Sequence, residues 1–159
     1  MNEPHTTQDI YSQAPNEAAF DFLHFLTDNG MTVERAGGYW EGQSYWYVKY
    51  LDEFVCFILF NGTGDEQRFS PLTIWTDDSG SGWYERPVPN KVLQQTAIHH
   101  IDICEHCGAC SGGTTKRIFG TEYANVCRTT FRFVNPTPDQ FRCLKTLLHL
   151  RKSDIENRQ

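Results

Sequence analysis

The sequence predicts an α+β domain with a mostly antiparallel sheet and helices on one face of it. Amphipathic helical patterns stand near both ends of the chain, at residues 15–29 and after Thr137. Between them, runs rich in aromatic and β-branched residues alternate with short turns. Short turns favour antiparallel pairing, because parallel strands need long crossover connections. A cysteine-rich segment interrupts this order, and we expect it to form an inserted knuckle over residues 102–127.

The first helix is expected over residues 15–29. Its apolar residues recur at spacings of three and four, which places them on one face of a helix; they are Ala19, Phe22, Leu23 and Leu26. Pro15 suits a first helical turn, and Asn29-Gly30 suits a left-handed stop. Residues 31–35 then alternate in polarity and predict a strand.

Residues 45–60 predict a β-hairpin. A strand rich in Tyr and Trp leads into a turn at Leu51-Asp52-Glu53, and a continuously apolar run follows. Such a run is typical of a central strand that is buried on both faces. Cys56 lies in its middle, and we interpret this thiol as a small buried hydrophobe. Residues 72–75 predict the next strand.

A further helix is expected over residues 90–101, followed by a strand over residues 126–134. Alternation along that strand places on one side Cys127, Thr129, Phe131 and Phe133. It places on the other side Arg128, Thr130 and Arg132.

The last helix has the clearest start of any element. Thr137 and Gln140 have the spacing of a capping box, and Pro138 occupies the first helical position. The apolar stripe of this helix consists of Phe141, Leu144, Leu147 and Leu148. Cys143 lies beside that stripe, so we assign it to core packing.

Length and composition indicate one domain. The chain has 159 residues, of which 39% are hydrophobic, and we assign residues 15–155 to the domain and residues 1–14 to a flexible tail. No apolar run approaches the roughly 20 residues of a membrane span. The N-terminal residues carry no apolar stretch of the kind that directs secretion, so we expect a cytoplasmic protein with reduced cysteines.

Charge is unevenly distributed along the chain. The net charge is −6, which argues against a general polyanion binder. Residues 1–110 hold 5 Lys and Arg against 16 Asp and Glu, whereas residues 111–159 hold 9 against 4. The basic residues that hint at a nucleic-acid surface are Lys116, Arg117, Arg128, Arg132, Arg142, Lys145, Arg151 and Lys152. Rather than a nucleic-acid surface, we expect these residues to form a solvated face whose charge is partly neutralised by the acidic part of the same domain.

The cysteines near position 104 are the strongest functional signal. A Cys-x2-Cys pair at Cys104 and Cys107 can bind one tetrahedral metal from a tight turn, and Gly108 lets the backbone direct N–H groups at the sulfurs. Cys110 and Cys127 complete a four-cysteine set. The sequence therefore predicts a Zn²⁺ site, and four thiolates leave no open coordination position, so we interpret the site as structural.

The sequence also allows other metals and other ligand sets at this site. Cys-x2-Cys-x2-Cys with a distal cysteine also binds iron–sulfur clusters, although Arg128 stands where ferredoxin-like runs commonly have proline. The histidines that compete for one position are His99, His100 and His106. A histidine or water ligand would open the site and indicate a metal-dependent hydrolase. The sequence thus leaves two alternatives to a structural zinc site: a metal-dependent hydrolase and a zinc-ribbon-like nucleic-acid binder.

Aromatic residues indicate a binding surface on the domain that the structural zinc would stabilise. The chain is rich in them for its size, and they include Trp40, Tyr45, Trp46, Tyr47, Tyr50, Trp75, Trp83 and Tyr84. Those on predicted strands divide between the two faces of the sheet. Core packing accounts for most of them, and the remainder could line a site for a small-molecule or protein partner. An exposed edge strand would also allow a homodimer.

The cysteine segment resembles that of a group of small uncharacterised bacterial proteins with a Cys-x2-Cys-Gly-x-Cys metal knuckle. The matching residues are Cys104–Cys110, Gly112-Gly113, Lys116, Ile118-Phe119-Gly120, Val126-Cys127-Arg128 and Phe131-Arg132-Phe133. Val55-Cys56-Phe57-Ile58 through Trp75 is similar to that group as well. The helices and aromatic strands also resemble YdhG-like α+β domains. The resemblance implies one domain with a cysteine metal site and implies no substrate.

Overall fold

The computed structural model describes residues 10–36, 42–106 and 111–158. Within these residues the sheet has seven strands in the order β1-β2-β3-β4-β7-β5, with β6 also paired to β7, and every pair is antiparallel. The strands are β1 Thr32–Arg35, β2 Ser44–Tyr50, β3 Glu53–Phe60, β4 Leu72–Thr76, β5 Ile101–Ile103, β6 Thr114–Ile118 and β7 Thr121–Val134. The helices are α2 Glu17–Asp28, α3 Lys91–Ile98 and α4 Pro138–Asn157, with short 3-10 helices η1 Gly64–Phe69 and η2 Trp83–Glu85. The α+β class with a mostly antiparallel sheet is confirmed.

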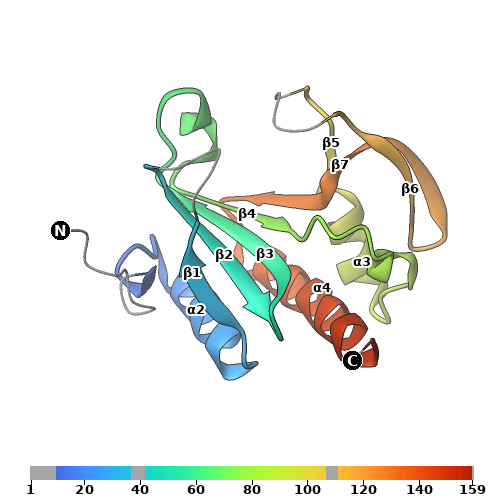
Figure 1. The fold of residues 1–159 in the computed structure, drawn as a ribbon, viewed down its shortest axis with the longest axis horizontal. Coiled ribbons are helices and arrows are strands. Elements are labelled where there is room, and N and C mark those ends of the chain that lie inside the picture. Colours follow the sequence, from blue (N-terminus) through green and yellow to red (C-terminus); the bar gives the residue numbers. More distant parts are fainter. Residues whose placement is uncertain (1–9, 37–41, 107–110, 159) are drawn as a thin grey trace.

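The helices cover one face of the sheet (Figure 1). Phe22 of α2, Ala97 of α3 and Leu144 of α4 belong to one buried cluster that includes the strand residues Trp46 and Ile58. All the residues that the sequence assigned to the inner stripes of the first and last helices are buried. The predicted capping box at Thr137 is present as well, with both of its hydrogen bonds.

The N-terminal part of the fold differs from the sequence prediction. The first helix begins at Glu17, not at Pro15, and Asn16 caps it, because the Asn16 side chain accepts a hydrogen bond from the Ala19 N–H at 2.9 Å. Ile10, which the sequence placed in the tail, is buried against the core. The Tyr11 hydroxyl is 2.8 Å from the Thr27 hydroxyl, so residues that precede the helix are held against it.

The predicted helix over residues 90–101 is too long. Asn90 caps α3 by accepting from two backbone N–H groups, but the helix ends at Ile98. Ile101 already belongs to β5, where it pairs with Phe131. A three-residue strand has too short a pattern to be distinguished from the end of a helix by periodicity.

β7 is longer than predicted and is bulged. Thr130 has a backbone φ of +66°, an unusual conformation for a β-branched residue, and the pairing register with β5 shifts here. Thr130 and Phe131 are both buried although they are adjacent. The prediction of one uninterrupted row from Cys127 to Phe133 is therefore wrong, because the bulge resets the alternation.

A second apolar cluster lies on the face of the sheet away from the helices. We call it the open-face cluster; its members are Tyr45, Tyr47, Phe54, Phe57, Leu59, Phe69 and Trp75. The aromatic residues of β2 thus divide between faces, with Trp46 in the helix-side core and its two tyrosine neighbours on the opposite side. Phe69 comes from η1 and packs edge-on against Trp75 at 5.1 Å between ring centroids.

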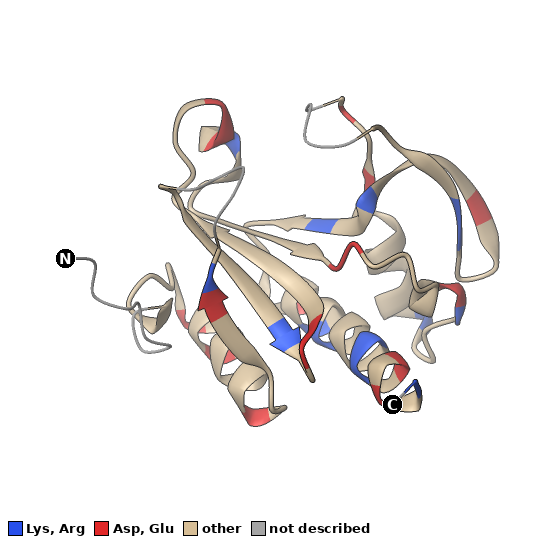
Figure 2. Cartoon of the chain, viewed as in Figure 1, with Lys and Arg blue, Asp and Glu red and all other residues tan. Residues whose placement is uncertain are grey.

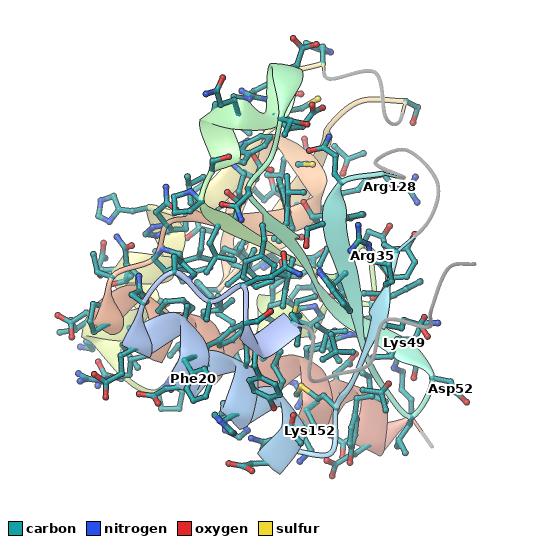
Figure 3. All side chains as sticks on the ribbon, turned by 90° about the vertical axis from the view of Figure 1, so that its left-hand side faces the viewer. Phe20, Arg35, Lys49, Asp52, Arg128 and Lys152 are labelled. Carbon is teal, nitrogen blue, oxygen red and sulfur yellow. The ribbon has the colours of Figure 1, made fainter. Side chains whose placement is uncertain are left out.

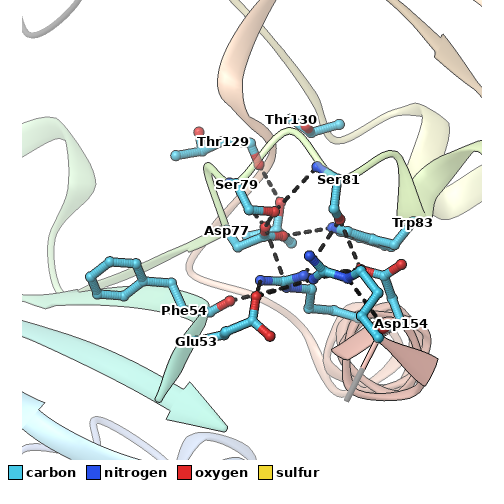
Figure 4. Close-up of polar contacts among 12 residues, drawn as sticks. Glu53, Phe54, Asp77, Ser79, Ser81, Trp83, Thr129, Thr130 and Asp154 are labelled. Carbon is cyan, nitrogen blue, oxygen red and sulfur yellow. Dashed lines mark hydrogen bonds and ion pairs between the residues drawn. The ribbon is translucent and has the colours of Figure 1, made fainter. Parts of the chain in front are cut away.

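A buried ion pair joins α4 to the sheet (Figure 4). The side chain of Arg151 is 1% exposed, and its Nε donates to the Phe54 carbonyl at 3.0 Å and lies 3.3 Å from the Asp77 carboxylate. Its Nη1 donates to Asp154 at 3.0 Å. Asp77 has a fully buried side chain and also accepts from the Trp83 indole at 2.6 Å. Every charge in this network therefore has a partner.

We predict that Arg151→Met costs about 3–5 kcal/mol, because it leaves the buried Asp77 carboxylate without its cation. Urea unfolding measures this difference in stability. Arg158→Met is the matched control, since Arg158 pairs with Glu53 and Asp154 but is 45% exposed. It should cost no more than about 1 kcal/mol. Equal costs for the two variants would contradict the role assigned to burial.

The β2–β3 hairpin closes through a two-residue turn. Leu51 and Asp52 have φ values of +48° and +66°, and the flanking Tyr50 and Glu53 pair with each other. Positive φ at both central positions marks a type I′ turn, which strongly prefers Asn-Gly. Leu51 is 54% exposed, and Asp52 points into solvent at the tip of the hairpin (Figure 3).

The double variant Leu51→Asn with Asp52→Gly should therefore stabilise the protein. Relief of the unfavourable backbone conformation is worth about 1 kcal/mol, which corresponds to a rise in Tm of about 2–4 °C for a chain of this size. Thermal unfolding followed by circular dichroism measures it. Leu51→Ala, which shortens the side chain and keeps a Cβ at positive φ, should leave Tm nearly unchanged.

Candidate metal centre

Of the four predicted cysteine ligands, Cys127 lies on β7 and Cys104 directly follows β5. Ile103 at the end of β5 pairs with Val126 of β7, and the Cys104 N–H donates to the Asn125 carbonyl at 2.8 Å. The backbone of Cys104 is therefore held beside Asn125, two residues before Cys127, although 23 positions separate the two cysteines in the sequence.

The backbone after Cys104 turns toward its sulfur. The His106 N–H donates to the Cys104 Sγ at 3.4 Å, and His106 has a φ of +56°. The Cys104 sulfur thus accepts a hydrogen bond from the backbone two residues later. The knuckle that the Cys-x2-Cys spacing predicts also needs Cys107 and Gly108, which lie outside the described residues.

Cys127 has polar neighbours. The Thr129 hydroxyl donates to its Sγ at 3.4 Å, and the Asp102 carboxylate is hydrogen-bonded to the same thiol. Burial raises the pKa of Asp102, and the Arg132 guanidinium 3.4 Å away works against that shift. The sulfur thus lies in a polar and partly charged environment, in contrast to Cys56 and Cys143.

Two arginines hold the residue that follows Cys104. The Glu105 carboxylate lies 2.5 Å from Nη1 of Arg68, which belongs to η1, and 3.2 Å from Nη2 of Arg132 on β7. The Arg68 hydrogen bond in particular lowers the pKa of Glu105. The segment between the first two cysteines is in this way tied to two other parts of the fold.

A partly buried lysine lies near Cys127. The Lys116 Nζ donates to the Arg128 carbonyl at 3.0 Å and to the Thr130 hydroxyl at 2.8 Å, and it lies over the Tyr84 ring. Burial lowers the pKa of the Lys116 ammonium, whereas the negative charge available at Cys127 opposes this. A cation in this place would offset part of the charge of a thiolate site.

The other predicted ligands divide into two groups. Cys107 and Cys110 lie outside the described residues, and among the residues that are described no three His, Cys, Asp or Glu side chains are placed to hold a metal ion. Among the competing histidines, the His100 ring nitrogen Nδ1 is 2.7 Å from the Thr96 carbonyl, and the ring stacks on Phe133. That geometry favours a packing role for His100.

The two cysteines that the sequence assigned to the core are buried. Cys56 lies in β3, and Cys143 in α4 directs its thiol to the Leu93 carbonyl at 3.3 Å. Burial raises the pKa of both thiols, that of Cys143 to about 12. Neither side chain therefore has the environment of a metal ligand or a nucleophile.

A shallow surface pocket adjoins the candidate centre. It has a volume of about 200 Å³ and is lined by His99, His100, Ile101, Asp102, Arg132 and Val134. Its single guanidinium is already paired with Asp102 and Glu105. The pocket therefore presents no unpaired cation to a ligand.

Sequence reasoning missed the polar groups around the cysteines. Asp102, Glu105 and Arg68 were not assigned to the site, and the position of Arg68 depends on η1, which was not predicted. An alternation argument could have found Asp102, since it lies two residues before Cys104 on a strand and so points to the same face.

Comparisons with known proteins bear on the resemblance noted above. The chain was compared with protein-family models, with curated proteins and with solved structures, and none of the three comparisons gave a match. The resemblance to small bacterial proteins stays a prediction, and the assignment of the site depends on the geometry of Cys104, His106 and Cys127.

Proposed function

We propose that this chain is a cytoplasmic zinc-binding protein in which a structural zinc stabilises a small-molecule or protein-binding module. The proposed ligands are Cys104, Cys107, Cys110 and Cys127. One observation supports the proposal: the His106 N–H is directed at the Cys104 sulfur, while the Cys104 backbone is hydrogen-bonded to Asn125 of β7, two residues before Cys127. Two cysteine-bearing segments from distant positions thus lie at the same end of the β5–β7 pair.

The donor chemistry fits zinc. Zn²⁺ prefers thiolate ligands in tetrahedral sites, and N–H groups directed at the sulfurs reduce the cost of gathering several negative charges. Lys116 and Arg132 lie near Cys127 and Glu105 and supply further positive charge. When bound, zinc would join β5 to β7, so its binding energy would contribute to folding.

A structural role is favoured over the hydrolase alternative. A catalytic zinc needs three protein ligands and a water, so one of the thiolates would be replaced. His100, the histidine closest in sequence to β5, is engaged with the Thr96 carbonyl and with Phe133. This arrangement supports four sulfur ligands.

The charge distribution disfavours the nucleic-acid alternative (Figure 2). Several basic side chains of the C-terminal third are paired inside the molecule: Arg151 with Asp77, Arg132 with Asp102, and Lys116 with backbone and hydroxyl oxygens. Nucleic-acid binding depends on cations that can contact phosphates. The uneven charge of the sequence therefore fits internal neutralisation better than a polyanion partner.

The open-face cluster supports the proposed binding module. Helices cover the other face of the sheet, whereas Tyr45, Tyr47 and Phe54 on this side are only partly buried. Half-buried aromatic side chains can contact planar or apolar partners without unfolding the sheet. We therefore assign a small-molecule or protein partner to this face.

The first test is the metal content and its ligands. Purified protein should carry about one zinc per chain by elemental analysis, and X-ray absorption should show four sulfur ligands at about 2.3 Å. Three or fewer sulfur ligands with a nitrogen or oxygen ligand would favour the hydrolase. A brown protein with a broad visible band would replace zinc by an iron–sulfur cluster.

The second test compares two cysteines of different environment. Cys104→Ser should remove the bound zinc and lower the free energy of unfolding strongly, because metal binding is coupled to folding. Cys143→Ala should cost about 1 kcal/mol and leave the zinc content unchanged, as expected for an ordinary core truncation. Unfolding with and without a chelator measures both effects. A Cys104→Ser protein that retains a full equivalent of zinc would contradict the ligand assignment.

A further inference from the structure

Glu105 lies at a junction of three segments. In the sequence it is the residue between Cys104 and His106, and in space its carboxylate contacts Arg68 of η1 and Arg132 of β7. The two guanidiniums use different oxygens, Oε2 for Arg68 and Oε1 for Arg132. One carboxylate therefore bridges η1, which is distant in the sequence from the knuckle, and β7, which also carries Cys127.

The same two arginines enclose Phe69. The guanidinium carbon of Arg68 lies 4.4 Å from the centroid of the Phe69 ring, and that of Arg132 lies 5.4 Å from it. Phe69 in turn packs edge-on against Trp75 in the open-face cluster. A continuous set of contacts thus leads from the knuckle backbone through Glu105 and the two arginines to this aromatic surface.

We propose that Glu105 couples metal binding at the knuckle to the order of η1 and of the open-face cluster. This inference rests on the proposed zinc site. A bound metal fixes the backbone on which Glu105 is carried, and a fixed carboxylate holds Arg68 and Arg132 against Phe69. Linkage requires the reverse effect as well: η1, by holding Glu105, favours the backbone conformation that binds metal.

The expected coupling is small. The side chains of Arg68 and Glu105 are 52% and 43% exposed, so solvent screens their attraction. Loss of one exposed ion pair of this kind changes an equilibrium by about two- to fivefold. The ion pair therefore changes the metal affinity only modestly, since the thiolates supply most of it.

Arg68→Gln tests the coupling from its far end. Arg68 is 36 positions before Cys104 and is not a proposed metal ligand, so it can affect metal affinity through Glu105 or through its own charge. The Glu105→Gln background distinguishes these two routes. Competition with a chelating indicator should show zinc affinity reduced by about two- to fivefold. In a Glu105→Gln background the same substitution should have no additional effect, because its partner is already neutral.

Arg142→Gln is the matched control. Arg142 is an exposed arginine on α4 with one carboxylate partner, Asp139, at 3.6 Å, so the substitution changes the net charge equally. It should leave zinc affinity unchanged. An equal loss in Arg68→Gln and Arg142→Gln would reveal a general charge effect and overturn the coupling.

Hydrogen–deuterium exchange provides a second measurement. In zinc-loaded Glu105→Gln protein, peptides that cover residues 64–70 should exchange faster than in the wild type, while peptides from β3 and α4 should be unchanged. Wild-type protein that binds no zinc would refute the proposed function. Zinc-bound variants with unchanged affinity and unchanged exchange at residues 64–70 would refute the coupling alone.

Discussion

The packing of α4 against the sheet depends on the buried guanidinium of Arg151. A charge that is removed from water must be met by opposite charge and by hydrogen-bond acceptors, or the fold loses several kcal/mol. Arg151 obtains them from the Phe54 carbonyl, Asp77 and Asp154. Asp77 also accepts from the Trp83 indole and thereby fixes η2 beside the helix. The end of β4, the start of β3 and the last turns of α4 are thus placed by one side chain.

The same pairing explains the uneven charge of the sequence. Asp77, Asp102 and Glu105 belong to the acidic part of the chain, whereas Arg132 and Arg151 belong to the basic part. In the fold these residues pair with each other across the sheet and around the candidate metal centre. Acidic and basic residues that lie on opposite sides of residue 110 in the sequence therefore lie close together in the fold.

Local patterns predicted the parts of the fold that local interactions determine. The capping box at Thr137, the stripes of α2 and α4 and the β2–β3 hairpin follow from periodicity and turn chemistry within a few residues. β6 was missed although it forms a tight hairpin with β7, because four of its five residues are polar and show no apolar alternation. The bulge at Thr130 was missed because it depends on pairing with β5, which lies far away in the sequence. At the site, the spacing of the cysteines predicted a metal, and the backbone pairing of Cys104 with Asn125 brings the first cysteine to β7. The bridge from Glu105 to Arg68 has no local signal, since 37 positions separate its ends.

The length of β7 affects the chain entropy that is lost on folding. Its C-terminal end pairs with β4, so that Thr73 lies opposite Val134, about 60 residues later, whereas β1 to β4 pair in the order in which they follow one another in the sequence. Closing a loop of that length costs more chain entropy than closing a hairpin, although the cost grows only logarithmically. The intervening residues include β5 and β6, which return to the N-terminal half of the same strand. The fold therefore concentrates the entropic cost of its long-range contacts in β7.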